Sequence, residues 1–193
     1  MNFYTFVRGL VKGVLTPFYR IHVVGTEHFP KDGGVLLCTN HINALDPPVV
    51  GITAPRPVSF MAKEELFSMP VLGRIVTNLN AFPVKRGMSD REALRTGLKA
   101  LKEGKVLGLF PEGTRSQNGE LGKGLAGAGF FAARTRAHIV PCAIIGPYKP
   151  FRKLKVVYGL PIEMDTLREN KASAEEVTEV IMQKIADLIR QNS

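Results

Sequence analysis

Apolar side chains recur at helical spacing over the first eighteen residues of the chain. They fall at i, i+3, i+4, i+7 and i+8 and continue in register, which predicts one amphipathic helix. Arg8 and Lys12 lie off this stripe, and Pro17 and Arg20 mark its end. A helix packed on the core of its own domain and a helix lying in a membrane surface both fit; phenylalanine at both ends, with cations on the flank, favours the membrane. The stripe consists of Phe3, Phe6, Val7, Leu10, Val11, Val14, Leu15 and Phe18.

Six short apolar runs follow, and each is bounded by Gly, Pro or Asn. Runs of this length with such boundaries predict β-strands, and their continuous apolar character is typical of strands buried on both faces. The six runs are residues 33–40, 56–63, 80–86, 105–113, 138–146 and 153–161.

Helical patterns lie between and after these runs. Ser89 with Glu92 predicts a capping box that opens a helix, and Gly104 is its stop signal. Ser173 with Glu176 predicts a second capping box, which opens a closing helix. The alternation predicts an α/β fold, a single domain with a largely parallel or mixed central sheet covered by helices.

Length and composition agree with one globular domain. The chain has 193 residues, of which 45% are apolar and 22% charged, which excludes disordered and coiled-coil classes. Its longest uncharged stretch, residues 33–45, is far shorter than the roughly 18–20 apolar residues of a spanning helix. Cys38 and Cys142 lie inside apolar runs without metal-ligand spacing, and the first ten residues lack the pattern of a secretory signal. We therefore expect a reducing, cytoplasmic setting.

The positive charge is concentrated in the body of the chain. Residues 1–162 carry 22 basic and 10 acidic side chains, whereas residues 163–193 carry 4 and 7. Such a field attracts nucleic acid, an anionic membrane or phosphorylated ligands. Few aromatic residues (8%), no tryptophan and no recognisable nucleic-acid module weigh against nucleic acid.

Polar residues interrupt the apolar pattern at strand ends, where α/β folds place ligands. His41 comes directly after a buried run, and Asp46 lies five residues on. Asp46 is placed to accept from one ring nitrogen, which leaves the other free to act as a base. Taken alone, the segment favours a plainer interpretation, in which Asp46 caps a turn and His41 is incidental.

Two further strand ends carry groups suited to phosphate. Glu112, Gly113, Thr114 and Arg115 in one turn supply a guanidinium, a hydroxyl and main-chain N–H groups, and Glu112 is expected to orient the arginine. An ordinary turn with surface charges fits equally well. The adjacent cations Lys85 and Arg86 form the third segment, which by itself is typical of a solvated loop.

The order of these segments carries more information than each segment alone. His41 to Asp46, Lys85 with Arg86, FPEGTRS (110–116) and IVPCA (139–143) resemble the four successive blocks of the glycerolipid acyltransferase family. Within that family, the chain is most similar to the short bacterial 1-acyl-sn-glycerol-3-phosphate (lysophosphatidate) acyltransferases. The resemblance spans roughly residues 20 to 162.

The resemblance implies transfer of a fatty acyl group from acyl-CoA or acyl carrier protein to the sn-2 hydroxyl of lysophosphatidate, forming phosphatidate. It makes His41 the general base and Asp46 the residue that fixes its tautomer. No metal or bound cofactor is expected. It assigns substrate binding to Lys85, Arg86, Glu112, Gly113, Thr114 and Arg115.

On this interpretation residues 1–19 are a membrane-associating helix and residues 20–193 the acyltransferase domain. We expect a peripheral protein on the cytoplasmic face of the cell membrane, with an anionic membrane surface as partner. An acyltransferase of the same family with another acceptor, glycerol 3-phosphate or another lysolipid, remains an alternative. A non-catalytic membrane-binding module ranks below it, because such a module would not need both His41 and Asp46.

Overall fold

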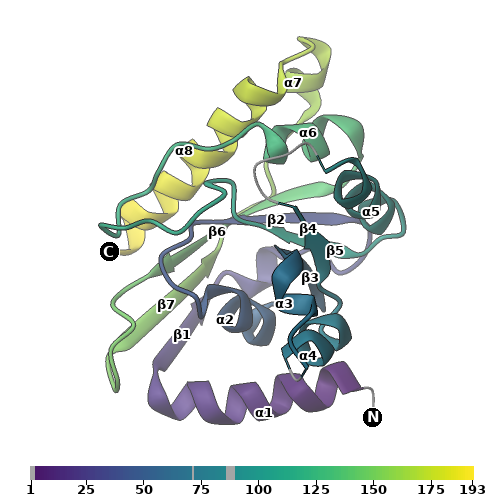
Figure 1. The fold of residues 1–193 in the computed structure, drawn as a ribbon. Helices are drawn as coiled ribbons and strands as arrows, with labels where there is room; N and C mark the ends of the chain where they lie inside the picture. Colours follow the sequence, from purple (N-terminus) through teal and green to yellow (C-terminus); the bar gives the residue numbers. More distant parts are fainter. Residues whose placement is uncertain (1–2, 71, 86–89) are drawn as a thin grey trace.

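The computed structural model describes residues 3–70, 72–85 and 90–193. They form one seven-stranded mixed β-sheet with helices on both of its faces (Figure 1). The predicted fold class, a single α/β domain with a largely parallel or mixed sheet, is therefore confirmed.

The elements follow one another with short connections, as expected of an α/β chain. The strands are β1 (Arg20–Val24), β2 (Val35–Thr39), β3 (Val58–Lys63), β4 (Phe82–Val84), β5 (Val106–Leu109), β6 (His138–Ile145) and β7 (Lys153–Tyr158). The helices are α1 (Phe3–Phe18), α2 (Asp46–Thr53), α3 (Glu64–Phe67), α4 (Leu72–Asn78), α5 (Arg91–Lys102), α6 (Gly127–Arg134), α7 (Asp165–Glu169) and α8 (Ala174–Asn192), with a 3₁₀ turn at Thr26–His28.

The strand order is β1-β7-β6-β2-β5-β3-β4. The five strands from β6 to β4 run parallel, whereas β7 is antiparallel to β6 and carries β1 alongside it. Because parallel strands end together, the residues that follow β2, β5, β3, β4 and β6 all lie at one edge of the sheet. That edge is where ligands bind in open α/β sheets.

The sequence predicted the six strands β2 to β7 but not β1. It lies at the border of the sheet, pairs only with β7, and is mostly exposed. Its sequence, RIHVV, lacks the apolar continuity that marks the buried strands.

Two helical layers bury the two faces of the sheet. All five residues of β2 are buried, and alternate side chains point to opposite faces. Leu37 packs with Val49 and Val50 of α2, whereas Leu36 packs with Phe131 of α6 and Ile181 of α8. Helix α5 lies on the same side as α6 and α8 (Figure 1).

One of the two predicted helix caps is confirmed and the other is displaced. Ser173 and Glu176 form the complete capping box of α8. Helix α5 is capped by Asp90, whose side chain accepts from the main-chain N–H groups of Glu92 and Ala93. The predicted cap, Ser89, lies outside the described residues.

Helix α1 lies along one side of the molecule, on the face that α2 covers (Figure 1). The side chains of the apolar stripe do not all face the domain. Val7 is buried against the domain, whereas Leu10 and Val14 are exposed. Arg8, expected on a membrane-facing flank, instead donates to the carbonyl groups of Ile52 and Ala54 at the end of α2. No helix in the described part of the chain is both long and apolar enough to cross a membrane.

Both cysteines are free and buried, as expected from their apolar surroundings. Cys38 packs towards the α5, α6 and α8 face, and Cys142 packs towards the α2 face. Burial raises the pKa of Cys142 to about 12, so its thiol stays protonated near neutral pH.

Candidate active site

His41 is held at the end of β2 by contacts on its main chain and on its ring. Its backbone N–H donates to Oε1 of Glu112 at 2.8 Å, and its ring stacks on Phe110 with centroids 4.0 Å apart. The preceding side chain, Asn40, exchanges two hydrogen bonds with the backbone of Ile144 in β6, at 2.9 and 2.8 Å. The imidazole is therefore fixed in position before any substrate binds.

Asp46 is the first residue of α2 and is completely buried. Its Oδ2 lies 2.8 Å from Nδ1 of His41, so the hydrogen bond expected from the sequence is present. The same oxygen accepts from the main-chain N–H groups of Ile42 and Asn43, both at 2.7 Å. Asp46 thus both shapes the turn and orients the histidine, which unites the two interpretations of this segment.

The partners of Asp46 also determine the tautomer of His41. A carboxylate can only accept hydrogen bonds, and therefore Nδ1 of His41 carries the proton in this pair. Nε2 is then the unprotonated nitrogen of the neutral ring, with a lone pair available to a proton donor.

Tyr148 completes the surroundings of Asp46 and was not identified from the sequence. Its hydroxyl donates to Oδ1 of Asp46 at 2.6 Å from the connection between β6 and β7. Burial, and then the charge of Asp46, raise the pKa of Tyr148 far above its usual value, so that the phenol stays protonated. A tyrosine 102 residues along the chain gives no local pattern that links it to Asp46.

Glu112 has a different place from the one predicted. Both of its carboxylate oxygens accept main-chain N–H groups, from His41 at 2.8 Å and from Gly122 at 3.0 Å. It therefore does not orient Arg115, and as a buried anion it is unsuited to face a phosphate. The structure instead makes Glu112 a brace between β2 and the connection that follows β5.

The remaining residues of the predicted phosphate turn lie at its exposed tip. Gly113 has a φ of 70°, which favours glycine, and its N–H donates to the carbonyl of Phe110 and is therefore already used. Thr114 and Arg115 are exposed. Arg115 makes no hydrogen bond or ion pair with any residue of the described ranges, so its guanidinium is free to bind an anion.

Main-chain hydrogen bonds join the 110–116 turn, at the start of the long connection between β5 and α6, to the His41–Asp46 pair, termed the dyad below. The N–H of Ser116 donates to the carbonyl of His41 at 2.7 Å, one residue beyond Arg115. Farther along the same connection, the N–H of Leu125 donates to the carbonyl of Pro111 at 2.8 Å. The main chain next to Arg115 is therefore held against that of His41.

Lys85 lies at the same edge of the sheet but at a distance from the dyad. It follows β4, which is three strands from β2, or roughly 14 Å at the usual strand spacing. Its amino group is 3.8 Å from Glu64, and the pair is exposed. Its neighbour in the prediction, Arg86, lies outside the described residues.

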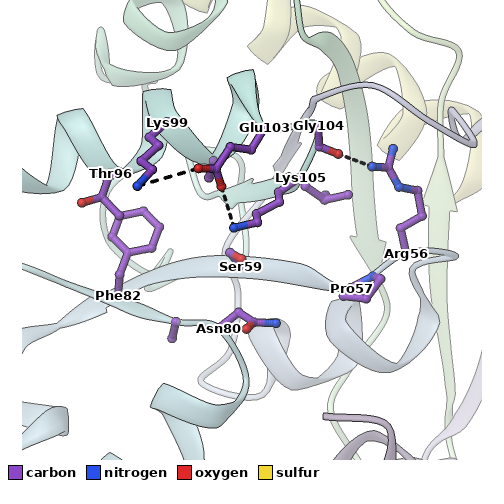
Figure 2. A pocket seen from close by; sticks show the side chains of 13 residues that line it. Arg56, Pro57, Ser59, Asn80, Phe82, Thr96, Lys99, Glu103, Gly104 and Lys105 are labelled. Atoms are coloured by element: carbon purple, nitrogen blue, oxygen red, sulfur yellow. Dashed lines mark hydrogen bonds and ion pairs between the residues drawn. The ribbon is translucent and has the colours of Figure 1, made fainter. Parts of the chain in front are cut away.

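A hollow of about 520 Å³ lies at the opposite edge, where β3, β4 and β5 begin. Figure 2 shows that its cations are already engaged: Lys99 and Lys105 pair with Glu103, and Arg56 donates to the carbonyl of Gly104. Because it lies across the sheet from His41, it is separate from the candidate active site. Within the described ranges, no group of His, Cys, Asp and Glu side chains is arranged to hold a metal ion.

The chain is similar to known proteins along most of its length. The family model described as Acyltransferase matches residues 20–145. A 1-acyl-sn-glycerol-3-phosphate acyltransferase of Bacillus subtilis (strain 168) is 30% identical over 193 residues, covering 96% of each chain. The enzyme of that name from Borreliella burgdorferi is 30% identical over 176 residues, covering 86% of this chain and 70% of its own.

A solved structure extends the comparison to the fold. The crystal structure of the 1-acyl-sn-glycerophosphate acyltransferase PlsC from Thermotoga maritima superimposes with a TM-score of 0.81 at 23% identity. The match covers 98% of this chain and 80% of that one, and it shows a shared fold. The family model and the relatives that match along most of the sequence settle the family: the chain belongs to the acyltransferases.

Proposed function

We propose that this acyltransferase moves a fatty acyl group from a thioester to the sn-2 hydroxyl of 1-acyl-sn-glycerol 3-phosphate, making phosphatidate. The observation that carries the proposal is the buried His41–Asp46 pair, with Nδ1 facing the carboxylate, at the carboxyl edge of the sheet. Relatives that match nearly the whole chain and bear the name of this activity support the choice of acceptor.

The dyad supports direct transfer without an acyl-enzyme. Nε2 of His41 takes the proton of the acceptor hydroxyl as its oxygen attacks the thioester carbonyl. The tetrahedral intermediate collapses, the carbon–sulfur bond breaks, and the thiolate receives the proton from the imidazolium. Asp46 stabilises the imidazolium and fixes its orientation, as the carboxylate of a hydrolase triad does.

Binding of the acceptor phosphate supplies orientation. General-base assistance contributes about 10²–10⁴-fold, so positioning has to supply much of the remaining acceleration. We assign the phosphate to Arg115, which is free among the described residues and is tied to the dyad through Ser116. Thr114 is exposed beside it and supplies a hydroxyl. Lys85, farther along the edge, is suited to a more distant phosphate, such as one on the donor.

We assign the enzyme to the surface of an anionic membrane, at its cytoplasmic face. The acceptor is itself a membrane lipid, and acyl-CoA and acyl carrier protein are cytoplasmic donors. The exposed part of the α1 stripe and the excess of basic residues support attachment through the surface of the bilayer.

The test is the purified protein with lysophosphatidate and either acyl-CoA or acyl carrier protein, in buffer containing excess EDTA. Phosphatidate should form with at least one donor, and His41→Ala should form less than about a hundredth as much. Replacing the acceptor by glycerol 3-phosphate or by a lysolipid without phosphate tests the alternative acceptors. Activity that disappears with EDTA and returns with Mg²⁺ or Zn²⁺ would contradict a mechanism without metal.

A further inference from the structure

The exposed apolar residues of α1 form a single row. They fall at every fourth position, so they lie one above another on the same face of the helix, over about 18 Å of its length. They lie beside the half of the stripe that packs on the domain. The row consists of Phe6, Leu10, Val14 and Phe18, with 53, 59, 60 and 46% of their surface exposed.

A fifth apolar side chain, from a distant part of the sequence, extends this row. Phe151 precedes β7 and is 67% exposed, and its ring centroid lies 5.7 Å from that of Phe18. Its main-chain N–H donates to the carbonyl of Phe18 at 2.8 Å, which fastens the β6–β7 connection to the end of α1. The five residues, Phe6, Leu10, Val14, Phe18 and Phe151, are termed the apolar row below.

The backbone of Phe151 is unfavourable for the residue that occupies it. Its φ is 62°, in the left-handed region, where an aromatic residue is rare and costs free energy. Asparagine or glycine would adopt this conformation more readily. Within the chain, the Phe151 ring contacts that of Phe18 but stays 67% exposed, so a strained phenylalanine here points to a contact made outside the domain.

Basic side chains border the same end of the row. Three exposed basic residues, Lys149, Arg152 and Lys153, flank Phe151 in sequence. Arg20 is also exposed and lies opposite Lys153 in the register of the parallel strands β1 and β7. None of the four forms an ion pair with a residue in the described ranges. Free cations beside exposed apolar side chains complement a surface that presents anionic groups above hydrocarbon.

We propose that the β6–β7 connection is a second membrane contact, in which Phe151 enters the headgroup region of an anionic bilayer together with the α1 row. The inference rests on the proposed function, in that it assumes attachment through α1. It adds a second contact beside Phe18, at the C-terminal end of α1, which is the end nearer the active site.

The placement of this contact orients the dyad with respect to the lipid. The ring of Phe18 lies against Tyr19 at 5.4 Å, and Tyr19 lies against Tyr148 at 5.6 Å. Tyr148 in turn donates to Asp46. With the apolar row in the bilayer surface, two aromatic contacts and one hydrogen bond would connect it to Asp46.

The chain contains no tryptophan, which permits a direct test. Phe151→Trp places the single tryptophan of the chain in the β6–β7 connection, and Leu160→Trp is its matched control. Leu160 has the same 67% exposure but follows β7, so the six-residue strand, about 20 Å long, separates the two. Val14→Trp reports on α1 itself. The probe is vesicles of phosphatidylcholine and anionic phosphatidylglycerol, with and without brominated acyl chains.

Insertion predicts a blue shift and quenching by brominated lipid for Phe151→Trp and Val14→Trp, and neither for Leu160→Trp. If Val14→Trp responds and Phe151→Trp does not, the second contact is absent and the proposed attachment stands. If both are silent, attachment through α1 fails as well. A blue shift without vesicles that grows with protein concentration would assign the row to contact with a second copy of the chain, which overturns the inference.

A second variant separates membrane contact from a role in folding. Phe151→Asn relieves the left-handed backbone, so the unfolding temperature should stay the same or rise. The dissociation constant for the anionic vesicles should nonetheless increase roughly tenfold, because an aromatic side chain leaves the interface. Unchanged vesicle affinity, or a lower unfolding temperature with affinity intact, would make Phe151 a packing residue and overturn the inference.

Discussion

The hydroxyl of Tyr148 lies 2.6 Å from Oδ1 of Asp46, the carboxylate oxygen that does not face His41. A buried carboxylate with a donor on each oxygen is fixed in rotation as well as in position. We therefore expect Tyr148 to act on the reaction through Asp46, as a positioning residue.

Tyr148→Phe removes this hydrogen bond and keeps the ring. We expect kcat to fall by about 10- to 150-fold, the range of a lost hydrogen bond to a charged group, with KM for the acceptor unchanged. In the native enzyme the raised pKa of Tyr148 keeps the phenol protonated even where an ordinary tyrosine ionises, near pH 10. Plots of kcat against pH should therefore have the same shape near pH 10 for the native enzyme and for Tyr148→Phe. A fall in kcat near pH 10 that occurs in the native enzyme and is absent from Tyr148→Phe would show that Tyr148 ionises there.

Asp46→Ala should lower stability as well as activity. The carboxylate accepts from two main-chain N–H groups, from Tyr148 and from His41, and the substitution leaves these buried or partly buried donors without that partner. We expect a loss of roughly 2–5 kcal/mol in the free energy of unfolding, measured with urea. His41→Ala breaks only one of these bonds, so it should abolish turnover at a much smaller cost in stability.

Glu112→Gln tests whether this residue braces His41 or binds phosphate. Glutamine has one carbonyl oxygen, so it can accept from His41 or from Gly122 but not well from both. As a brace, Glu112 should affect kcat and lower the unfolding temperature, with little change in KM for lysophosphatidate. A higher KM at unchanged kcat and stability would return Glu112 to the phosphate site.

Much of the fold was predictable from the sequence because its strands are buried. The apolar runs at β2, β5 and β6 correspond to strands covered on both faces, and their carboxyl ends place His41 and the 110–116 turn together. The His41–Asp46 contact was predictable for a local reason, since five residues of chain form one turn.

Relationships across the sheet could not be predicted in this way. Adjacency in the turn suggested that Glu112 pairs with Arg115, whereas the chain reverses at Gly113 and the carboxylate points back to β2. Likewise, Tyr148 reaches Asp46 only because β6 lies next to β2, an adjacency that no local pattern encodes. The division of the α1 stripe depends equally on where α2 lies.

Asp90 gives the fold a dependence on acid pH. Main-chain N–H groups, first that of Ala93 and then that of Lys85, lower the pKa of Asp90. A lowered folded-state pKa means that the stabilisation is complete above the unfolded value, about 3.9, and is lost as the pH falls through the folded value. Asp90→Asn keeps an acceptor for the cap without the charge, so its unfolding temperature should fall less steeply below about pH 4. If the unfolding temperature falls equally steeply with pH in the native protein and in Asp90→Asn, Asp90 does not contribute to the loss of stability in acid.

Arg115→Lys separates charge from shape at the phosphate. Lysine keeps the positive charge but loses the planar fork that binds two oxygens of one phosphate at once. We expect KM for lysophosphatidate to rise about tenfold, with the unfolding temperature unchanged because the side chain is exposed and makes no hydrogen bond or ion pair within the described ranges. Arg136→Lys is the control, an exposed arginine at the far edge of the sheet, beside the start of β6. Steady-state kinetics with the phosphorylated acceptor decide the matter, since equal KM values for native enzyme and Arg115→Lys would remove Arg115 from the phosphate site and leave its free guanidinium without a partner.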